Sequence, residues 1–437
     1  MDWQQLLSNK RLGQEQLHYK RKDDRTEFKR DYDRLIFSAP FRRLQNKTQV
    51  FPLPGSIFVH NRLTHSLEVA SVGRSLGDDV ARRLTERRPE LADTHMPEIG
   101  AIVSAACLAH DMGNPPFGHS GERAIASYFS EAGGQRYESH MTKEQWSDLT
   151  HFDGNANTFR LLTHQFKGRR TGGFVLTYST LASIVKYPFP SIQATKQKFG
   201  YFQSDKENYE RIAQELDILS APGVGYRHPL VYLVEAADDI CYEIMDLEDA
   251  HKLRLLSTEE TQQLLLDFLE PERRSRVLDI MQQVDDRNEQ IAYLRSCAVG
   301  VLEHECVDTF VDNEASILAG TFTGSLIKHI DPRVRQAYQH CTEVSVERIY
   351  RSKEVVDVEL AGYRIISQLI DLFTEAVMNP DREYSRQLLN RVSSQYEIDA
   401  TDDYTRIMAV LDFVSGMTDV FALDLYRKIN GESLPMI

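Results

Sequence analysis

Residues 109–122 read Ala109-His110-Asp111-Met112-Gly113-Asn114-Pro115-Pro116-Phe117-Gly118-His119-Ser120-Gly121-Glu122. The apolar run before this stretch, residues 102–109, predicts a buried helix because helix-forming residues begin near Glu98. Gly113 and the prolines after it cannot continue a helix, since glycine is permissive and proline lacks a backbone donor. His110 and Asp111 therefore lie at a helix end, where both side chains can turn toward one point. The pair predicts half of a divalent-metal site, although a chain with 14 histidines also contains such a dipeptide by chance.

The composition is that of a globular protein, with 437 residues of which 41% are hydrophobic and 27% charged. This length suffices for one large helical core or two to three modules. No apolar run approaches ~18 residues and the N-terminus lacks a secretion signal, so we expect a cytoplasmic protein without a membrane partner. Five scattered cysteines without a Cys-x-x-Cys pair indicate reduced core residues rather than zinc ligands. The net charge of −14 argues against a general nucleic-acid coat, so an anionic substrate needs a local basic pocket.

Apolar residues recur with the helical period of 3.6 through most of the chain. The helices that this pattern predicts span 63–84, 98–110, 120–131, 206–219, 228–249, 258–268, 275–294, 297–311, 340–349, 354–378, 383–393 and 404–429. No two-residue alternation is long enough to anchor a sheet, so the predicted class is all-α. Segments 133–150 and 168–205 look irregular, and long loops of this kind are often lids or binding loops.

Basic and aromatic residues alternate in the N-terminal segment, from Lys20-Arg21-Lys22 to Phe41-Arg42-Arg43-Leu44. One interpretation is an amphipathic helix with a solvated basic face packed by aromatic side chains. The other is a cationic wall for phosphate, because arginine matches phosphate oxygens bidentately. Further along, Arg62 and His65 are three residues apart at the start of a predicted helix, which places a cation beside a potential metal ligand.

A carboxylate that could complete the metal site lies in the predicted helix 228–249. Asp238, Tyr242 and Asp246 fall at i, i+4 and i+8 on one stripe, while Asp239 points about 100° away. Because neighbouring side chains are apolar, a carboxylate here is either partly buried with a partner or faces solvent at the edge of the core.

These residues carry a family resemblance. Arg62-x-x-His65, His110-Asp111 and Asp238 together resemble the HD-domain metal phosphohydrolases. The surrounding sequence looks like the bacterial deoxyguanosinetriphosphate triphosphohydrolases over about residues 20–250. The motifs are Phe41-Arg42-Arg43-Leu44-Gln45-Asn46-Lys47-Thr48-Gln49-Val50, Arg62-Leu63-Thr64-His65-Ser66-Leu67-Glu68-Val69, His110 to Glu122, Phe152-Asp153-Gly154-Asn155-Ala156 and Glu235-Ala236-Ala237-Asp238-Asp239-Ile240, with a weaker match at Ser415-Gly416-Met417-Thr418-Asp419. One departure is at Asp153 and Asn157, where the resemblance leads us to expect Glu and Gln.

The resemblance implies an all-α HD-domain fold with additional C-terminal helices. A metal phosphohydrolase core with the basic N-terminal segment would occupy residues 1–272, with a soft boundary near 270–275. A helical region at 273–437 would pack on this core and at oligomer interfaces. The implied reaction is hydrolysis of deoxynucleoside triphosphates, dGTP or several dNTPs, to deoxynucleoside and inorganic triphosphate. The implied assembly is a homo-oligomer such as a hexamer, with a second dNTP or single-stranded DNA as a possible effector.

The resemblance also implies the site residues. The metal ligands would be His65, His110, Asp111 and Asp238. This mixed imidazole and carboxylate set suits a divalent ion such as Mn, Mg or Fe. Asp238 is preferred to Asp239 because the family has Tyr and Asp four and eight residues beyond its ligand, and these match Tyr242 and Asp246.

The implied catalytic pair is His119 as acid or base and Glu122, three residues further on, as its orienting partner. The implied substrate contacts fall into two groups: Arg62, Lys186 and Lys198 on the triphosphate, and Gln49, Tyr242 and Asp246 around the sugar. Gln49 would check the 3′ hydroxyl, while Tyr242 and Asp246 would reject a 2′ hydroxyl. An isolated His-x-x-Glu is more often a surface pair, and loop lysines are normally solvated.

Two other functions stay open at this stage. An HD protein could cleave a different nucleotide, such as a cyclic nucleotide or an alarmone phosphodiester, because the metal ligands alone do not choose the bond. The chain could also be a non-catalytic nucleotide-sensing or single-stranded-DNA-binding protein that uses its basic N-terminal surface.

Overall fold

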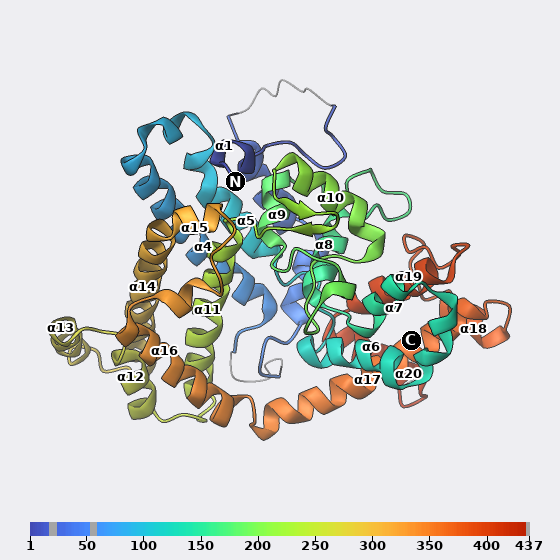
Figure 1. Cartoon of the computed structure of the whole chain (residues 1–437). Coiled ribbons are helices and arrows are strands. Elements are labelled where there is room, and N and C mark those ends of the chain that lie inside the picture. The colour runs from blue at the N-terminus through green and yellow to red at the C-terminus, as the bar shows by residue number, and fades with distance from the viewer. Residues whose placement is uncertain (17–23, 53–58, 434–437) are drawn as a thin grey trace.

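The computed structural model describes residues 1–16, 24–52 and 59–433. Within these ranges the chain is helical, and the one sheet is an antiparallel pair of short strands, β1 (Leu219–Ala221) and β2 (Val224–Gly225). The predicted all-α class is therefore confirmed (Figure 1). None of the described helices is long and apolar enough to cross a membrane.

The α-helices follow one another along the chain in this order. Those up to residue 252 are α1 (Trp3–Leu6), α2 (Glu27–Ile36), α3 (Ala39–Arg43), α4 (Arg62–Arg87), α5 (Ile99–Ala109), α6 (Gly118–Glu131), α7 (Lys143–Thr150), α8 (Gly154–Thr163), α9 (Tyr178–Ile184), α10 (Lys206–Glu215) and α11 (Val231–Lys252). Those beyond are α12 (Thr258–Leu266), α13 (Pro271–Met281), α14 (Arg287–Asp312), α15 (Glu314–Leu318), α16 (Pro332–Val344), α17 (Lys353–Met378), α18 (Glu383–Leu389), α19 (Asp403–Ser415) and α20 (Asp419–Ile429).

Two predicted helices are wrong as single elements, because capping residues break them. The prediction 275–294 spans the end of α13 and the start of α14, and Asp286 begins α14 by accepting from two backbone N–H groups. The prediction 404–429 spans α19 and α20, and Thr418 caps α20 by accepting from the Phe421 N–H. Each cap accepts hydrogen bonds from backbone N–H groups in the first turn of the new helix. In a continuous helix these groups would be bonded to the preceding turn.

The two segments predicted to be irregular contain helices. α7 lies in 133–150 and begins with a capping box between Thr142 and Gln145, and α9 lies in 168–205. The basic residues Lys20-Arg21-Lys22 lie outside the described residues. The described part of the N-terminal segment forms α2 and α3, and α2 buries Phe28 and Leu35 as an amphipathic helix would.

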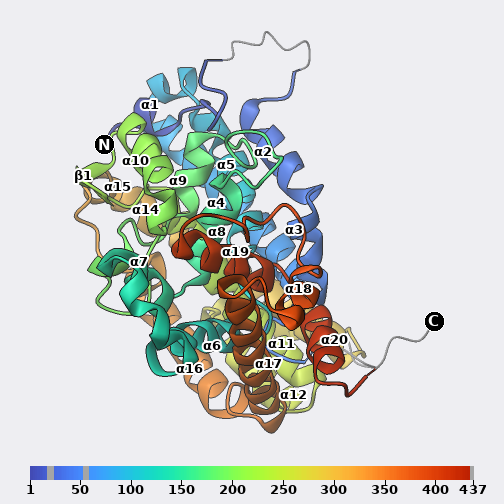
Figure 2. The ribbon, with the colours of Figure 1, turned by 90° about the vertical axis from the view of Figure 1, so that its right-hand side faces the viewer.

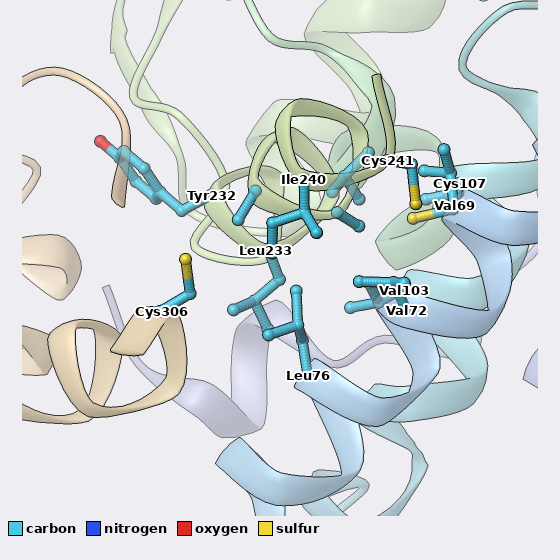
Figure 3. Packing of buried hydrophobic residues seen from close by; sticks show 14 of the residues in the cluster. Val69, Val72, Leu76, Val103, Cys107, Tyr232, Leu233, Ile240, Cys241 and Cys306 are labelled. Atoms are coloured by element: carbon cyan, nitrogen blue, oxygen red, sulfur yellow. The ribbon is translucent and has the colours of Figure 1, made fainter. Parts of the chain in front are cut away.

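The first hydrophobic cluster is built mainly on α4, α5, α11 and α14. Figure 3 shows side chains of α4 and α11 interleaving, with Cys107 of α5 beside Cys241 of α11. All five cysteines are free and buried, which agrees with the prediction that they are reduced core residues. Glycines let α4 and α5 approach closely, since a Cβ on Gly77 would lie 2.7 Å from the Cα of Gly100.

The second hydrophobic cluster joins α6 and α7 to α17, α19 and α20. α17 runs along the lower edge of Figure 1 from one group of helices to the other, and Figure 2 shows it beside α19 and α20. Its first turn packs in the first cluster through Val355, and Ile365 to Val377 pack in the second. α17 therefore packs directly against α6, which begins one residue before His119.

A buried charged group lies just before α4. The His60 ring places its Nε2 3.1 Å from Glu68 Oε1 and its Nδ1 2.9 Å from Asp249 Oδ2. Burial alone would lower the pKa of His60, but the two carboxylates outweigh it and raise the pKa to about 10. The imidazolium thus ties the start of α4 to α11.

We predict that Gly77→Ala destabilises the fold, because the added methyl group would meet the backbone of α5 rather than a flexible side chain. The free energy of unfolding, measured by urea denaturation, should fall by about 1–3 kcal/mol. Gly300→Ala in α14 is the control, since nothing lies within 4 Å of its added Cβ; higher helix propensity should leave it unchanged or stabilised by up to ~1 kcal/mol. Equal stability of the two variants would contradict this packing.

We predict that the stabilisation from His60 depends on pH. A group whose pKa is higher in the folded state stabilises fully below its unfolded pKa, about 6.5, and loses this effect as pH rises through about 10. Wild type should therefore exceed His60→Gln in stability by on the order of 3 kcal/mol near pH 6, and by progressively less toward pH 10. Parallel melting-temperature profiles for the two proteins would contradict this assignment.

Candidate active site

Four predicted ligands from three helices meet at one point. His65 lies in the first turn of α4, His110 and Asp111 follow the end of α5, and Asp238 lies in the middle of α11. Asp238 Oδ1 is 3.0 Å from His65 Nε2 and 3.5 Å from His110 Nε2, and Asp111 Oδ1 is 3.7 Å from His110 Nε2. Donor atoms of His65, His110 and Asp111 lie within 4.8 Å of one another, a spacing compatible with one metal ion.

The orientation of His110 suits metal binding. Its Nδ1 donates to the carbonyl of Cys107 at 2.6 Å, which fixes the tautomer and leaves the Nε2 lone pair facing the cluster. This Nε2 is buried and has no hydrogen-bond partner among the described residues. A buried nitrogen without a partner is costly unless something binds it. The donor set therefore fits a divalent cation.

Charge in the cluster supports the same conclusion. Burial disfavours the His110 imidazolium, but the carboxylates of Asp111 and Asp238 outweigh burial and raise the pKa of His110 to about 9. The two histidines in turn hold the pKa of the Asp238 carboxyl well below its usual range, despite its burial. The cluster thus attracts positive charge, which a proton or a metal ion can supply.

Asp238 and its neighbour Asp239 occupy different environments. Asp238 faces the two histidines, whereas burial raises the pKa of Asp239 to about 7 despite the nearby Lys186 ammonium. The separation follows from the 100° turn between adjacent helical residues. The stripe that carries Asp238 also carries Tyr242 and Asp246.

Arg62 connects the cluster to the next helix. Its guanidinium pairs with Asp111, whose other oxygen accepts from the Asn114 amide. The start of α6 lies directly against it, because a Cβ on Gly118 would be 2.6 Å from Arg62 Nη2. Arg62 therefore lies between a candidate metal ligand and the residue preceding His119.

His119 is exposed and its partner Glu122 is buried. The His119 side chain is 65% exposed, and its Nδ1 lies 2.8 Å from Glu122 Oε2. The other Glu122 oxygen accepts from the Gly154 N–H at 2.8 Å. Burial alone would raise the pKa of Glu122, but His119, the Lys198 ammonium and the Gly154 N–H together lower it to about 2. An ionised carboxylate thus orients an imidazole that is open to a ligand.

The predicted substrate lysines are already paired. Lys198 Nζ lies 3.6 Å from Glu122 Oε2 and 3.3 Å from Asp153 Oδ1. Lys186 Nζ lies 3.0 Å from Glu235 Oε1, and Arg227 contacts the other oxygen of Glu235. The structure thus places Lys198 beside the His119–Glu122 pair, and Lys186 in a separate network near Asp239.

Among the predicted sugar contacts, Asp246 is buried, and Gln49 and Tyr242 are partly buried. Gln49 Oε1 has no hydrogen-bond partner among the described residues. Asp246 accepts from the Tyr350 hydroxyl at 2.8 Å, and the rings of Tyr242 and Tyr350 lie 5.8 Å apart. Sequence reasoning missed Tyr350, because it lies over a hundred residues beyond Tyr242 and in none of the motifs.

Two residues that depart from the expected motif also have clear contacts. Asp153 caps α8 and accepts from the Phe199 N–H, close to Lys198. Asn157 donates to the carbonyl of Gly113 at 2.6 Å. These shorter side chains therefore support the loops around the candidate site.

A cavity of about 630 Å³ lies on the other side of Met112 and Asn157. Arginines and aromatic rings line much of it: Arg34, Arg43, Arg169, Arg170, Phe37, Phe166, Phe174 and Tyr396. Its lining includes neither the four candidate ligands nor His119, so it is separate from the cluster.

Comparison with known proteins places the chain in a family. The HD domain model matches residues 62–221, which include His65, His110 and Asp111, and the phosphohydrolase-associated domain model matches residues 329–428. A deoxyguanosinetriphosphate triphosphohydrolase-like protein of Pseudomonas aeruginosa (strain LESB58) is 39% identical over the whole of both chains. One of Synechocystis sp. is 37% identical over 99% of this chain and 100% of its own. A deoxyguanosinetriphosphate triphosphohydrolase of Yersinia enterocolitica is 29% identical over 92% and 93% of the two chains.

Full-length similarity of this extent, with both family models in order along the chain, identifies a common architecture. The chain therefore belongs to the deoxyguanosinetriphosphate triphosphohydrolase-like family of HD-domain hydrolases.

Proposed function

We propose that the protein hydrolyses deoxynucleoside triphosphates, dGTP or several dNTPs, to the deoxynucleoside and inorganic triphosphate. The observation that carries this proposal is the cluster of His65, His110, Asp111 and Asp238, in which the buried Nε2 of His110 has no hydrogen-bond partner within the described parts of the chain. Curated relatives named for this reaction match the chain over almost its full length.

The four residues of the cluster would hold one divalent ion, such as Mn, Mg or Fe. When bound, such an ion supplies charge neutralisation at phosphate and lowers the pKa of water. The Nδ1 contact of His110 with Cys107 would keep its Nε2 aimed at the ion. Arg62 would hold Asp111 in place until phosphate oxygens compete for its guanidinium.

Cleavage occurs between the 5′ oxygen and the α-phosphorus, and a water oxygen becomes bonded to phosphorus. The 5′ oxygen is a poor leaving group and needs a proton. We assign this proton to Nε2 of the exposed His119, with Glu122 accepting from Nδ1 and stabilising the imidazolium. Because Glu122 is buried and ionised, it holds the His119 ring in one orientation. A solvent-exposed carboxylate would not restrict the ring in this way.

Substrate binding would use the local cations of an otherwise acidic protein. Arg62, Lys186 and Lys198 would exchange their present carboxylate partners for triphosphate oxygens. Gln49 would contact the 3′ hydroxyl, and its amide oxygen, which accepts no hydrogen bond from any described residue, fits that role. Tyr242 and Asp246 would leave no room for a 2′ hydroxyl.

We also propose a division into a catalytic core at 1–272 and a helical region at 273–437, with assembly into a homo-oligomer such as a hexamer. A second dNTP or single-stranded DNA would act as effector. We place the enzyme in the cytoplasm, where free thiols such as its five cysteines are usual.

One observation favours the non-catalytic alternative, a protein that senses nucleotides or binds single-stranded DNA. The cavity lined by Arg34, Arg43, Arg169 and Arg170 combines cations with aromatic rings, as nucleic-acid sites do. Salt-sensitive DNA binding without turnover of any nucleotide would favour this alternative over catalysis.

The proposed reaction is tested by its product. Purified protein with Mn or Mg and each of the four dNTPs, singly and mixed, should release intact triphosphate, whereas another HD phosphodiesterase would release pyrophosphate or monophosphate. Asp238→Ala should lower both bound metal and triphosphate release by about 100-fold. Asp239→Asn is the matched control and should retain its metal. An Asp238→Ala protein with full metal content and turnover would refute the ligand assignment.

We predict that His119→Ala lowers kcat by about 10²–10⁴-fold because the leaving oxygen loses its acid. Metal content should not change, since His119 is not a ligand in the proposed set. His140→Ala is the control, because His140 is also paired with a carboxylate, Asp403, at 2.6 Å on the surface. Undiminished turnover of His119→Ala at saturating substrate would exclude the proposed role.

A further inference from the structure

The segment between Asp111 and His119 includes two successive residues in the left-handed region. Phe117 has φ 61° and Gly118 has φ 55°. Phenylalanine seldom adopts this conformation without contacts that hold it. The segment Gly113–Gly118, here called the catalytic turn, therefore needs external support to present His119 in one orientation.

The first support is Asp419, the first residue of α20. Its Oδ1 accepts from the Phe117 N–H at 3.0 Å, and its Oδ2 accepts from the Thr48 N–H at 2.8 Å. Its side chain is buried. The Asp419 carboxylate thus holds the backbone at Phe117, two residues before His119, and at Thr48, one residue before Gln49.

A second support comes from Lys47, a buried lysine. Its Nζ donates to the carbonyl of Asn114 at 2.5 Å and to the carbonyl of Ser415 at 2.8 Å. Asn157 makes a parallel bridge, donating to the carbonyl of Gly113 and to Ser415 Oγ. Ser415, at the end of α19, is therefore linked through Lys47 and Asn157 to the start of the catalytic turn, while Asp419, at the start of α20, contacts its other end directly.

A third support is α17. A Cβ on Gly362 would lie 2.4 Å from the Phe117 Cβ, so glycine at this position lets the Phe117 side chain pack against the helix. One turn earlier, the carbonyl of Glu359 accepts from Ser120 Oγ at 2.6 Å. α17 and α20 both lie in the part of the chain that matches the phosphohydrolase-associated domain.

We propose that Asp419 is a positioning residue of the active site, through which the C-terminal helices set the catalytic turn and the Thr48–Gln49 backbone together. This inference rests on the proposed function, because it gives His119 and Gln49 their roles. Asp419 acts through the backbone N–H groups of Phe117 and Thr48, and its described hydrogen bonds include none to the four candidate ligands.

The first test compares Asp419→Asn with Asp31→Asn. An asparagine offers one oxygen instead of two, so either the Phe117 or the Thr48 N–H loses its acceptor. Asp31 is a matched control, since it is also buried and accepts from the Thr177 N–H, and its side-chain partners are Arg11 and Thr177. Both variants should melt earlier than wild type.

At a temperature well below either melting point, Asp419→Asn should lower kcat by about tenfold or more, because small misplacements of a catalytic group are costly. Its affinity for Mn²⁺, measured by EPR titration, should stay within about threefold of wild type. Asp31→Asn should keep wild-type kcat. A wild-type kcat in Asp419→Asn, or equal kcat losses in both variants, would overturn the proposal.

The second test needs no turnover. Gly362→Ala should displace Phe117, while Gly300→Ala, with open space around its Cβ, is the matched control. Hydrogen–deuterium exchange should rise in peptides covering 112–122 in Gly362→Ala and Asp419→Asn, and in peptides covering 44–50 in Asp419→Asn. Neither control should change them, and unchanged exchange of both peptides in Asp419→Asn would refute the proposal, whatever Gly362→Ala does. If wild type hydrolyses no dNTP, the proposed function fails, and exchange alone decides whether Asp419 holds the turn.

Discussion

Every carboxylate buried in this helical core must find a positive or donating partner, and this constraint shapes the whole site. A charge removed from water costs several kcal/mol unless it is paired and hydrogen-bonded. The buried Asp111 meets a guanidinium and an amide, the buried Glu122 meets an imidazole and a backbone N–H, and the partly buried Asp238 meets two imidazoles. The partners come from separate helices, so the pairs can form only when α4, α5, α6 and α11 are packed as observed. Glycines on α4 and α5 permit that approach.

Sequence reasoning predicted the all-α class and the end of α5, because both depend on local signals. A 3.6-residue apolar period and a Gly-Asn-Pro-Pro run act within a few residues of one another. Sequence reasoning failed where a polar cap divides a longer apolar pattern, as Asp286 and Thr418 do. It also failed where a helix begins with a capping box inside a polar stretch, as at Thr142. A cap is a single polar side chain, so it does not interrupt the apolar period from which the helices were predicted.

Part of the candidate site could also be predicted from local sequence spacing. The i, i+4, i+8 stripe set Asp238 apart from Asp239, and the family resemblance favoured Asp238 as the ligand. The structure places the two carboxylates in different surroundings. The pairing of Tyr350 with Asp246 and the bridges made by Asp419 link residues more than a hundred positions apart. No periodicity relates such positions, because only tertiary packing brings them together. The Ser415–Asp419 motif was visible in the sequence, but its contacts were not.

The catalytic turn draws its supports from Lys47, Asn157 and Asp419, which are spread over more than 370 residues. During synthesis, the candidate ligands on α4, α5 and α11 all leave the ribosome well before Asp419 does. A growing chain can therefore gather its imidazoles and carboxylates while His119 is still unconstrained, since contacts of such long sequence separation form last. Metal-binding capacity and catalytic competence would then be acquired at different stages of the chain's own synthesis. On the proposed assignment of roles, a chain that has not yet completed its C-terminal helices could bind metal but would lack the Asp419 contact that holds the turn before His119.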